Sequence, residues 1–303
     1  MRRFWPLFLF SLIFVIALIA VKPESTILID SVDSPQRIIS LSPSITETLF
    51  ALGLANKVVA VSDYCDFPLE ANDLPKVGGL MNPSLEAIIA QQADLVILSA
   101  KQQRTIKQLQ HLTIATLAVD STTLFDIKET ITAIGQRTEH QQQAKKLLTL
   151  LENKIHFIAE NTKSLSRPTV MISLGNSTSN EQINSVYIAG QNDFYNDLIT
   201  LAGGTNVYKD TRLNVPSLSV EGIIQLNPDI IIDIYPEADD HNADLQQVLQ
   251  RWQSLKHINA VKNNRIYIIE ESYATIPGPR VILLLEQFAR LIHPEVRWDK
   301  ITP

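Results

Sequence analysis

The sequence predicts an α/β fold with two Rossmann-like lobes, each with a parallel-type sheet, joined by one long interdomain α-helix. Short β-branched runs alternate with amphipathic helical patterns between residues 37 and 119, and the same alternation resumes after residue 167. Residues 139–163 separate the two series, contain neither glycine nor proline, and keep apolar residues at helical spacing. Alternating strands and helices favour helix-covered parallel sheets, and the uninterrupted stretch favours a rigid connection.

The N-terminal lobe is predicted to span residues 35–138. Ser44 followed by Glu47 matches a capping box at the start of its first helix, and Gly53 is placed to end that helix. The predicted elements, in order, are a strand at 38–41, this helix, a strand at 57–62, a helix and strand within 84–99, a helix around 102–111 and a strand at 113–119.

The predicted interdomain helix covers residues 139–164, and about 24 helical residues would extend roughly 36 Å. The C-terminal lobe is predicted to span residues 165–298. Because no glycine-rich or serine-rich hinge joins the lobes, we expect limited lobe motion. Its predicted elements are a strand at 169–175, a helix at 192–204, a helix and strand within 219–235, a helix at 245–255, a strand at 265–270 and a closing helix at 278–294.

One helix-and-strand sequence motif occurs twice in the chain. SLEAIIAQQADLVI begins at Ser84 and SVEGIIQLNPDIII at Ser219, and six of the fourteen positions are identical. TETLFALGLANKVV from Thr46 and YNDLITLAGGTNVY from Tyr195 form a second, weaker pair. Chance similarity between amphipathic segments is the alternative, but the two pairs together favour an internal duplication.

The N-terminus resembles an export segment. Two arginines precede eighteen uncharged residues, so residues 1–23 are expected to form a cleaved signal peptide or a retained membrane anchor. Cys65 is the only cysteine, which excludes an internal disulfide and argues against a lipid anchor. A formal net charge of −6 argues against nucleic acid as a partner.

Common catalytic signatures are missing from the sequence. It has no glycine-rich nucleotide loop, no G-x-S-x-G elbow and no H-E-x-x-H helix, and its six histidines are scattered singly. The acidic loop that starts at Glu237 is expected to be solvated rather than to bind a metal, and acidic neighbours oppose thiolate formation at Cys65. We therefore expect neither catalytic residues, nor a cofactor, nor a metal; an α/β enzyme with an unrecognised site stays the alternative of a different class.

Glu86 and Glu221 occupy the same position in the repeated motif, two residues after its serine. The helix dipole alone favours a carboxylate in a first turn, so either glutamate by itself needs no functional role. As a pair, they would offer similar carboxylates to a partner with two-fold symmetry.

Taken in order, the motifs resemble the helical-backbone class (class III) of periplasmic substrate-binding proteins that serve ABC importers, and the resemblance covers nearly all of residues 35–293. Within this class, the cobalamin binders resemble the sequence most in their motif pattern, and ferric-siderophore and haem binders are related members. The stretches that carry it are RIISLSPSITETLFALG, VSDYCDFP, KVGGLMNPSLEAIIAQQADLVI, the long helix, AGQNDFYNDLITLAGGTNVYKDTR, SVEGIIQLNPDIII and PGPR.

The resemblance implies a non-enzymatic, monomeric, periplasmic protein that binds a corrinoid between its lobes. An iron chelate or haem is the alternative ligand within the same class, and a sensory or docking protein held by a retained anchor is a further alternative. The implied partner is an inner-membrane ABC permease dimer with its ATPase, and Glu86 and Glu221 match the glutamates that contact it.

The resemblance also implies a set of ligand-binding residues. Tyr64 matches the cleft tyrosine of the class, and Leu80 and Val215 stand where cobalamin binders have tryptophans. Arg212 and Arg280 could bind an anionic group of the ligand, although a salt bridge within one lobe would explain Arg280 equally well. The complete set of candidate ligand-binding residues is Tyr64, Leu80, Met81, Tyr187, Arg212, Val215 and Tyr273.

Overall fold

The computed structural model describes residues 34–179, 182–235 and 245–298. Within this part of the chain, the residues from Pro35 onward belong to one compact unit. No helix in these ranges combines the length and the apolar composition needed to cross a membrane. The N-terminal segment 1–23 and the acidic loop at residues 237–244 lie outside the described residues.

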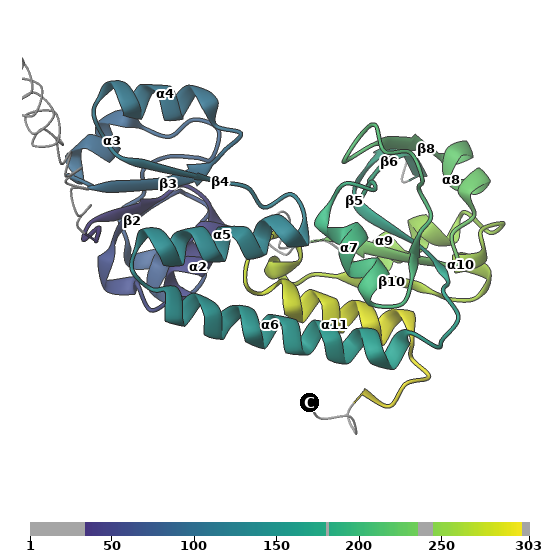
Figure 1. Cartoon of the computed structure of the whole chain (residues 1–303). Helices are drawn as coiled ribbons and strands as arrows, with labels where there is room; N and C mark the ends of the chain where they lie inside the picture. The colour runs from purple at the N-terminus through teal and green to yellow at the C-terminus, as the bar shows by residue number, and fades with distance from the viewer. Residues whose placement is uncertain (1–33, 180–181, 236–244, 299–303) are drawn as a thin grey trace, which may run out of the picture. The chain divides into compact units, whose positions relative to one another are not determined.

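The first lobe is built on a four-stranded parallel sheet in the order β2-β1-β3-β4 (Figure 1). Its two central strands, β1 and β3, are buried almost throughout, as expected for a sheet with helices on both faces. The strands are β1 (Ile38–Ser40), β2 (Val58–Val61), β3 (Leu95–Ser99) and β4 (Thr116–Val119), and the helices are α2 (Pro43–Ala51), α3 (Leu85–Ala90), α4 (Gln103–His111) and α5 (Leu124–Arg137).

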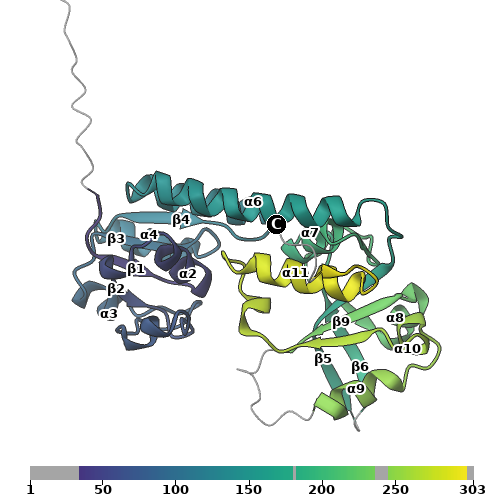
Figure 2. The ribbon, with the colours of Figure 1, turned by 90° about the horizontal axis from the view of Figure 1, so that it is seen from below.

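A single long helix, α6 (Gln141–Thr162), leads from the first lobe to the second. Its 22 residues extend about 33 Å. Ala144, Leu151 and Ile158 form its buried stripe, and the helix contacts α5 as well as α7 (Phe194–Leu201) and α11 (Val281–Ile292) of the second lobe. Figure 2 shows α11 running alongside α6. The fold class is therefore confirmed: two α/β lobes joined by a long helix.

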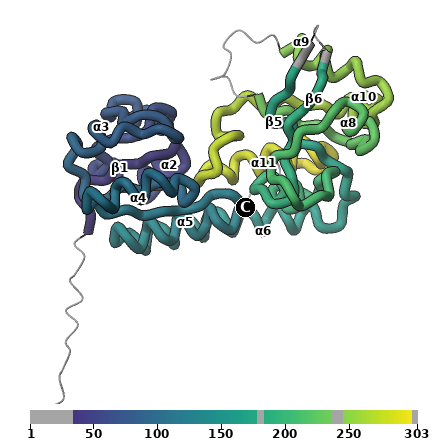
Figure 3. Tube along the Cα trace, turned by 90° about the horizontal axis from the view of Figure 1, so that it is seen from above, coloured from purple at the N-terminus to yellow at the C-terminus, as the bar shows by residue number. Residues whose placement is uncertain are grey.

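The second lobe contains a six-stranded sheet whose main path is β10-β9-β5-β6-β8. β5 and β6 form an antiparallel hairpin that is visible in Figure 3, and β8 pairs antiparallel with β6. The strands are β5 (Thr169–Ser179), β6 (Gln182–Ile188), β7 (Thr205–Asn206), β8 (Ser217–Ser219), β9 (Ile230–Ile234) and β10 (Ile266–Ile269); the remaining helices are α8 (Val220–Leu226), α9 (Leu245–Gln253) and α10 (Asn259–Lys262).

The two lobes repeat one parallel topology. In the first lobe, β1 pairs on one side with β2 and on the other with β3, which in turn pairs with β4. In the second lobe, β5 pairs in the same way with β7 and β9, and β9 pairs with β10. Thus β2-β1-β3-β4 corresponds to β7-β5-β9-β10. The antiparallel strands β6 and β8 are an addition to the second copy, and they extend the sheet beyond the short β7.

The repeated motif also has the same helix cap and the same left-handed residue in both copies. Ser84 and Ser219 are the N-caps of α3 and α8, accepting hydrogen bonds from the backbone N–H groups of the residues three positions later. The ninth position of each copy is left-handed, with φ of 49° at Gln92 and 46° at Asn227. Matching caps and a matching left-handed end support the internal duplication.

The aspartate that recurs in the repeated motif has the same structural role in both lobes. Asp94 accepts a hydrogen bond from the backbone N–H of Arg37 at 3.0 Å, and Asp229 accepts one from that of Thr169 at 2.9 Å. Each aspartate also donates its own backbone N–H to the carbonyl of the same partner. Because the partners stand at the beginnings of β1 and β5, the aspartates fix the alignment of neighbouring parallel strands.

One local expectation needs correction. Ser42, not Ser44, is the N-cap of α2, and Pro43 takes the first helical position, where its missing N–H costs nothing. Glu47 is therefore not part of a capping box. Helices α5 and α10 and strands β6 and β8 were not anticipated from the pattern, whereas Gly53, with φ of 79°, does end α2. The exact domain limits at residues 138 and 165 remain predictions.

Candidate ligand-binding and docking sites

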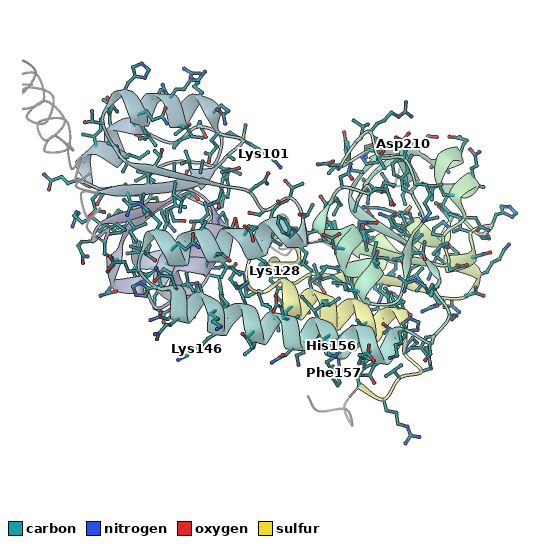
Figure 4. The ribbon with its side chains drawn as sticks, in the orientation of Figure 1. Lys101, Lys128, Lys146, His156, Phe157 and Asp210 are labelled. Carbon is teal, nitrogen blue, oxygen red and sulfur yellow. The ribbon has the colours of Figure 1, made fainter. Side chains whose placement is uncertain are left out.

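In an open parallel sheet, loops at the carboxyl ends of the strands are the usual place for a ligand. Tyr64 follows β2, Lys101 follows β3 and Asp120 follows β4, so these three side chains belong to one edge of the first sheet. Figure 4 shows Lys101 on its loop in the first lobe. Neither Lys101 nor Asp120 was anticipated from the sequence; their position directly after two predicted strands was the available signal.

Tyr64 is held beside the loop that carries Leu80 and Met81. Asp63 and Gly78 exchange two hydrogen bonds, from Asp63 N to Gly78 O at 3.1 Å and from Gly78 N to the Asp63 carboxylate at 3.2 Å. A Cβ at Gly79 would lie 3.6 Å from the Tyr64 ring. The structure thus places these predicted residues on adjacent loops, where Tyr64 is 68% exposed, Met81 is exposed and Leu80 is half-buried.

Lys101 and Asp120 form a charged pair at the same edge. The Lys101 ammonium donates to the Thr122 hydroxyl at 2.8 Å and lies 4.0 Å from the Asp120 carboxylate. Burial by itself would raise the pKa of Asp120, but hydrogen bonds from Thr122 and Ser121 and the nearby Lys101 lower it. Asp120 is therefore ionised at neutral pH, and the pair gives this loop a fixed polar geometry.

In the second lobe, Tyr187 and Val215 share an exposed sheet face. Tyr187 pairs with Ser217, and the ladder continues through hydrogen bonds from Ile188 N to Pro216 O and from Gly190 N to Asn214 O. This register sets Val215 diagonally across from Tyr187 on one face, because side chains alternate along a strand. Tyr187 is 51% exposed and Val215 is exposed as well.

Close backbone packing holds this face in place. A Cβ on Gly190 would lie 2.3 Å from the carbonyl oxygen of Leu213, so only glycine permits this approach. Asn192 donates its side-chain amide to Thr211 O at 2.9 Å, which ties the loop that carries Arg212 to the segment between β6 and α7. The loop is thus positioned by its own lobe.

Arg212 is exposed and forms an ion pair with Asp210, the residue labelled in the second lobe of Figure 4. Hydrogen bonds from Arg212 lower the pKa of Asp210 to about 2. The guanidinium is largely open to solvent, so it can still donate hydrogen bonds to an anionic group of a ligand.

Tyr273 and Arg280 are only partly exposed. Tyr273 follows β10, is half-buried, and donates its hydroxyl to Gln287 at 3.2 Å. Arg280 makes a bidentate ion pair with Glu47, at 2.6 and 2.9 Å, and its guanidinium lies 3.8 Å from the centre of the Phe67 ring. Because Glu47 lies on α2 of the first lobe, the expectation of a salt bridge within one lobe is wrong: this pair joins the lobes.

Glu86 and Glu221 occupy equivalent exposed positions at the second residue of α3 and α8. Neither carboxylate makes an ion pair with another described residue. A hydrogen bond from the Ser219 hydroxyl and one from its own backbone N–H lower the pKa of Glu221. Glu221 is therefore charged at neutral pH.

Residues that could bind a metal do not cluster in the described ranges, where no group of three His, Cys, Asp or Glu side chains has suitable geometry. Cys65 is buried and lies 3.1 Å from the hydroxyl oxygens of both Ser62 and Thr46. Burial raises the pKa of its thiol, which keeps it neutral and packed in the core.

Comparison with known proteins supports the resemblance over most of the chain. The family model described as periplasmic binding protein matches residues 38–273. An uncharacterized ABC transporter substrate-binding lipoprotein, YvrC of Bacillus subtilis, is 29% identical over 86% of this chain and 81% of its own. A vitamin B12-binding protein of Pectobacterium carotovorum is 26% identical over 84% of this chain and 87% of its own.

A solved structure agrees with these relatives. The crystal structure of a possible iron-binding (periplasmic solute-binding) protein of Staphylococcus epidermidis is 28% identical, with a TM-score of 0.71, and the match covers 86% of this chain and 99% of that one. The family consists of solute-binding proteins rather than enzymes. The repeated parallel topology, the connecting helix and the family match over residues 38–273 lead to one conclusion: the chain belongs to the periplasmic binding protein family, as a substrate-binding protein of an ABC transporter.

Proposed function

We propose that this protein captures a cobalamin-like corrinoid between its two lobes and delivers it to an inner-membrane ABC permease. The observation that carries the proposal is the pair of exposed tyrosines, Tyr64 in the first lobe and Tyr187 in the second. An exposed aromatic ring that its own lobe holds in place offers a flat apolar face to a macrocycle. The vitamin B12-binding relative supports a corrinoid as the ligand.

Residues beside each tyrosine would complete the contact. Leu80 and Met81 follow Gly79, which adjoins the Tyr64 ring, and Val215 lies diagonally from Tyr187, so both lobes offer apolar area. Arg212 would receive an anionic or carbonyl group at the edge of the ligand, since its guanidinium is exposed. Tyr273, being half-buried, would contribute less area than the other two tyrosines.

A ferric siderophore or haem is the second candidate ligand. The Staphylococcus epidermidis structure, described as possibly iron-binding, favours this alternative. Leu80 and Val215 are smaller than the tryptophans that the resemblance to cobalamin binders would place there. Direct binding measurements separate the two ligand classes.

The ligand is tested by calorimetry and absorption titration of the exported chain with cyanocobalamin, haemin and a ferric hydroxamate chelate. We expect cyanocobalamin to bind with a Kd of about 1 µM or tighter, and the other two to bind at least tenfold more weakly. Tyr64→Ala and Tyr187→Ala should each weaken binding by roughly tenfold, the scale of one lost aromatic contact. Phe125→Ala, which removes an exposed ring from α5, serves as the control. Binding of haemin or the chelate alone would reject the corrinoid.

Delivery would use Glu86 and Glu221, one for each subunit of a permease dimer that works with its ATPase. Both side chains are exposed, and they occupy equivalent positions in the two copies of the repeat. Charge pairs of this kind orient docking more than they add affinity. The binding protein itself would act as a monomer in the periplasm.

The docking role is tested by reversing both charges. Glu86→Lys with Glu221→Lys should leave ligand affinity unchanged and abolish uptake into cells. Glu129→Lys with Glu152→Lys changes the net charge equally on α5 and α6 and should leave uptake intact. Normal uptake by the first double variant would refute this role.

A further inference from the structure

Each copy of the repeated helix exposes an isoleucine three residues after its glutamate. Ile89 on α3 is 48% exposed and Ile224 on α8 is 42% exposed. The isoleucine just before each one, Ile88 or Ile223, is fully buried and anchors the helix to its lobe. Packing within the lobe therefore accounts for the first isoleucine of the pair but not for the second.

The two exposed isoleucines are informative because they occupy the same repeat position and have similar exposed fractions. A single exposed aliphatic side chain on a soluble protein needs no explanation. Here, however, the same residue recurs at the same repeat position, with similar exposure, in lobes whose surroundings differ by the added strands β6 and β8. The match is thus a property of the repeated helix itself.

Helical spacing joins each isoleucine to its glutamate. Residues three positions apart lie on the same side of a helix, so Glu86 neighbours Ile89 and Glu221 neighbours Ile224. We call these two pairs the docking pairs. Each docking pair consists of an exposed carboxylate and an exposed apolar side chain on the same short helix, α3 or α8 (Figure 1). Neither carboxylate makes an ion pair with another described residue.

We propose that the docking pairs are two-part contacts for a two-fold symmetric permease, each subunit of which presents a cationic side chain next to an apolar socket. The proposal rests on the delivery role given above and deepens it by adding Ile89 and Ile224. Two chemically equal surfaces on one chain suit a partner that carries the complementary surface twice. A cationic side chain would pair with the carboxylate, and an apolar socket would bury the isoleucine away from water.

The two parts have different kinetic consequences. A solvent-exposed carboxylate accelerates the encounter through long-range attraction, an effect that salt weakens. An apolar side chain acts only once it is seated, so its loss shortens the life of the complex. The glutamates should govern the association rate and the isoleucines the dissociation rate.

The test is surface-based kinetics with the permease–ATPase complex in lipid nanodiscs and the exported chain in solution. Ile89→Ser with Ile224→Ser should raise the dissociation rate about tenfold or more, equivalent to at least about 1.4 kcal/mol, and change the association rate less than twofold. Ile89→Ala with Ile224→Ala, a milder pair, should raise the dissociation rate less. Phe125→Ser with Leu150→Ser, two more exposed apolar residues on α5 and α6, should change neither rate.

Glu86→Gln with Glu221→Gln separates failure of this inference from failure of the delivery role. It should lower the association rate and its dependence on salt. If this variant docks poorly while the serine variant dissociates like the unchanged protein, the isoleucine contact is refuted and the glutamate role stands. If both variants dock like the unchanged protein, the delivery role itself is refuted. Ligand affinity and thermal stability, measured on every variant, should stay within twofold and about 2 °C of the unchanged protein.

Discussion

At the scale of single residues, the ion pair between Glu47 and Arg280 is an enclosed charge contact that joins the lobes. The two residues are 233 positions apart, and the Glu47 side chain is almost completely buried. Burial raises the pKa of Glu47, while the hydrogen bonds and charge of Arg280 act against that rise. The Phe67 ring covers the guanidinium, which lies 3.8 Å from the ring centre.

Removing only the arginine should therefore be costly. Arg280→Met leaves a buried carboxylate without a counter-charge and is expected to lower the free energy of unfolding by about 3–5 kcal/mol. Glu47→Leu combined with Arg280→Met should recover most of this loss. Urea denaturation of both single variants and the double variant checks the coupling, and additive losses would show that the ion pair is not the cause.

Asp193 is a second residue whose charge bears on stability. Its carboxylate caps α7 by accepting from Tyr195 N at 3.0 Å. Burial raises its pKa to about 6, the Tyr195 hydrogen bond works in the opposite direction, and the Asp197 carboxylate adds to the rise. A pKa raised on folding means that protonation favours the folded state, so this contribution is lost as the pH rises from about 4 through about 6.

Asp193→Asn should remove that pH dependence, because asparagine keeps the cap but carries no charge. The variant is expected to be more stable than the unchanged protein at pH 7, by about 1–3 kcal/mol, and to show little difference at pH 4. Thermal unfolding across this pH range measures the difference. A constant difference at every pH would contradict the assignment.

At the scale of elements, the connecting helix α6 depends on one buried stripe. Leu151 is 1% exposed within the core, whereas its neighbour Leu150 faces solvent. Leu151→Ala should cost about 2–4 kcal/mol, through lost burial and the cavity that remains. Leu150→Ala, the same chemical change one position away, should cost less than about 0.5 kcal/mol. Equal losses in urea denaturation would show that the helix packs differently.

Elements with strong local signals could be predicted from the sequence, and elements without them could not. The strand at β9 is rich in isoleucine and interrupted only by Asp233, and α6 keeps helical spacing over 22 residues. The β5–β6 hairpin, by contrast, passes through the polar sequence NSTSNEQINS, which lacks a clear alternation. The cap of α2 was misassigned because Ser44 and Glu47 match a capping box, although Pro43 at the first position points to Ser42.

The candidate site shows the same division. The exposed tyrosines and the paired glutamates carry motif signals, so the sequence could nominate them. The partners of Arg280 and Asp120 depend on contacts between distant or successive loops, which no local pattern encodes. Register, too, was needed to set Val215 beside Tyr187.

At the scale of the whole molecule, several contacts oppose wide separation of the lobes. Besides the Glu47–Arg280 pair, Phe194 N donates to Thr122 O at 2.8 Å, and Leu124 N donates to the Asp197 carboxylate at 2.8 Å. With α6 added, these contacts make a large hinge motion costly. We expect ligand binding to leave the radius of gyration from small-angle scattering nearly unchanged, and a clear decrease would refute limited motion.

The central claim, that one planar ligand is held jointly by the two lobes, is tested most directly by a crystal structure with cyanocobalamin bound. We predict that the corrin ring contacts Tyr64 with Met81 on one side and Tyr187 with Val215 on the other. A ligand seated on one lobe alone, or away from both tyrosines, would contradict the claim.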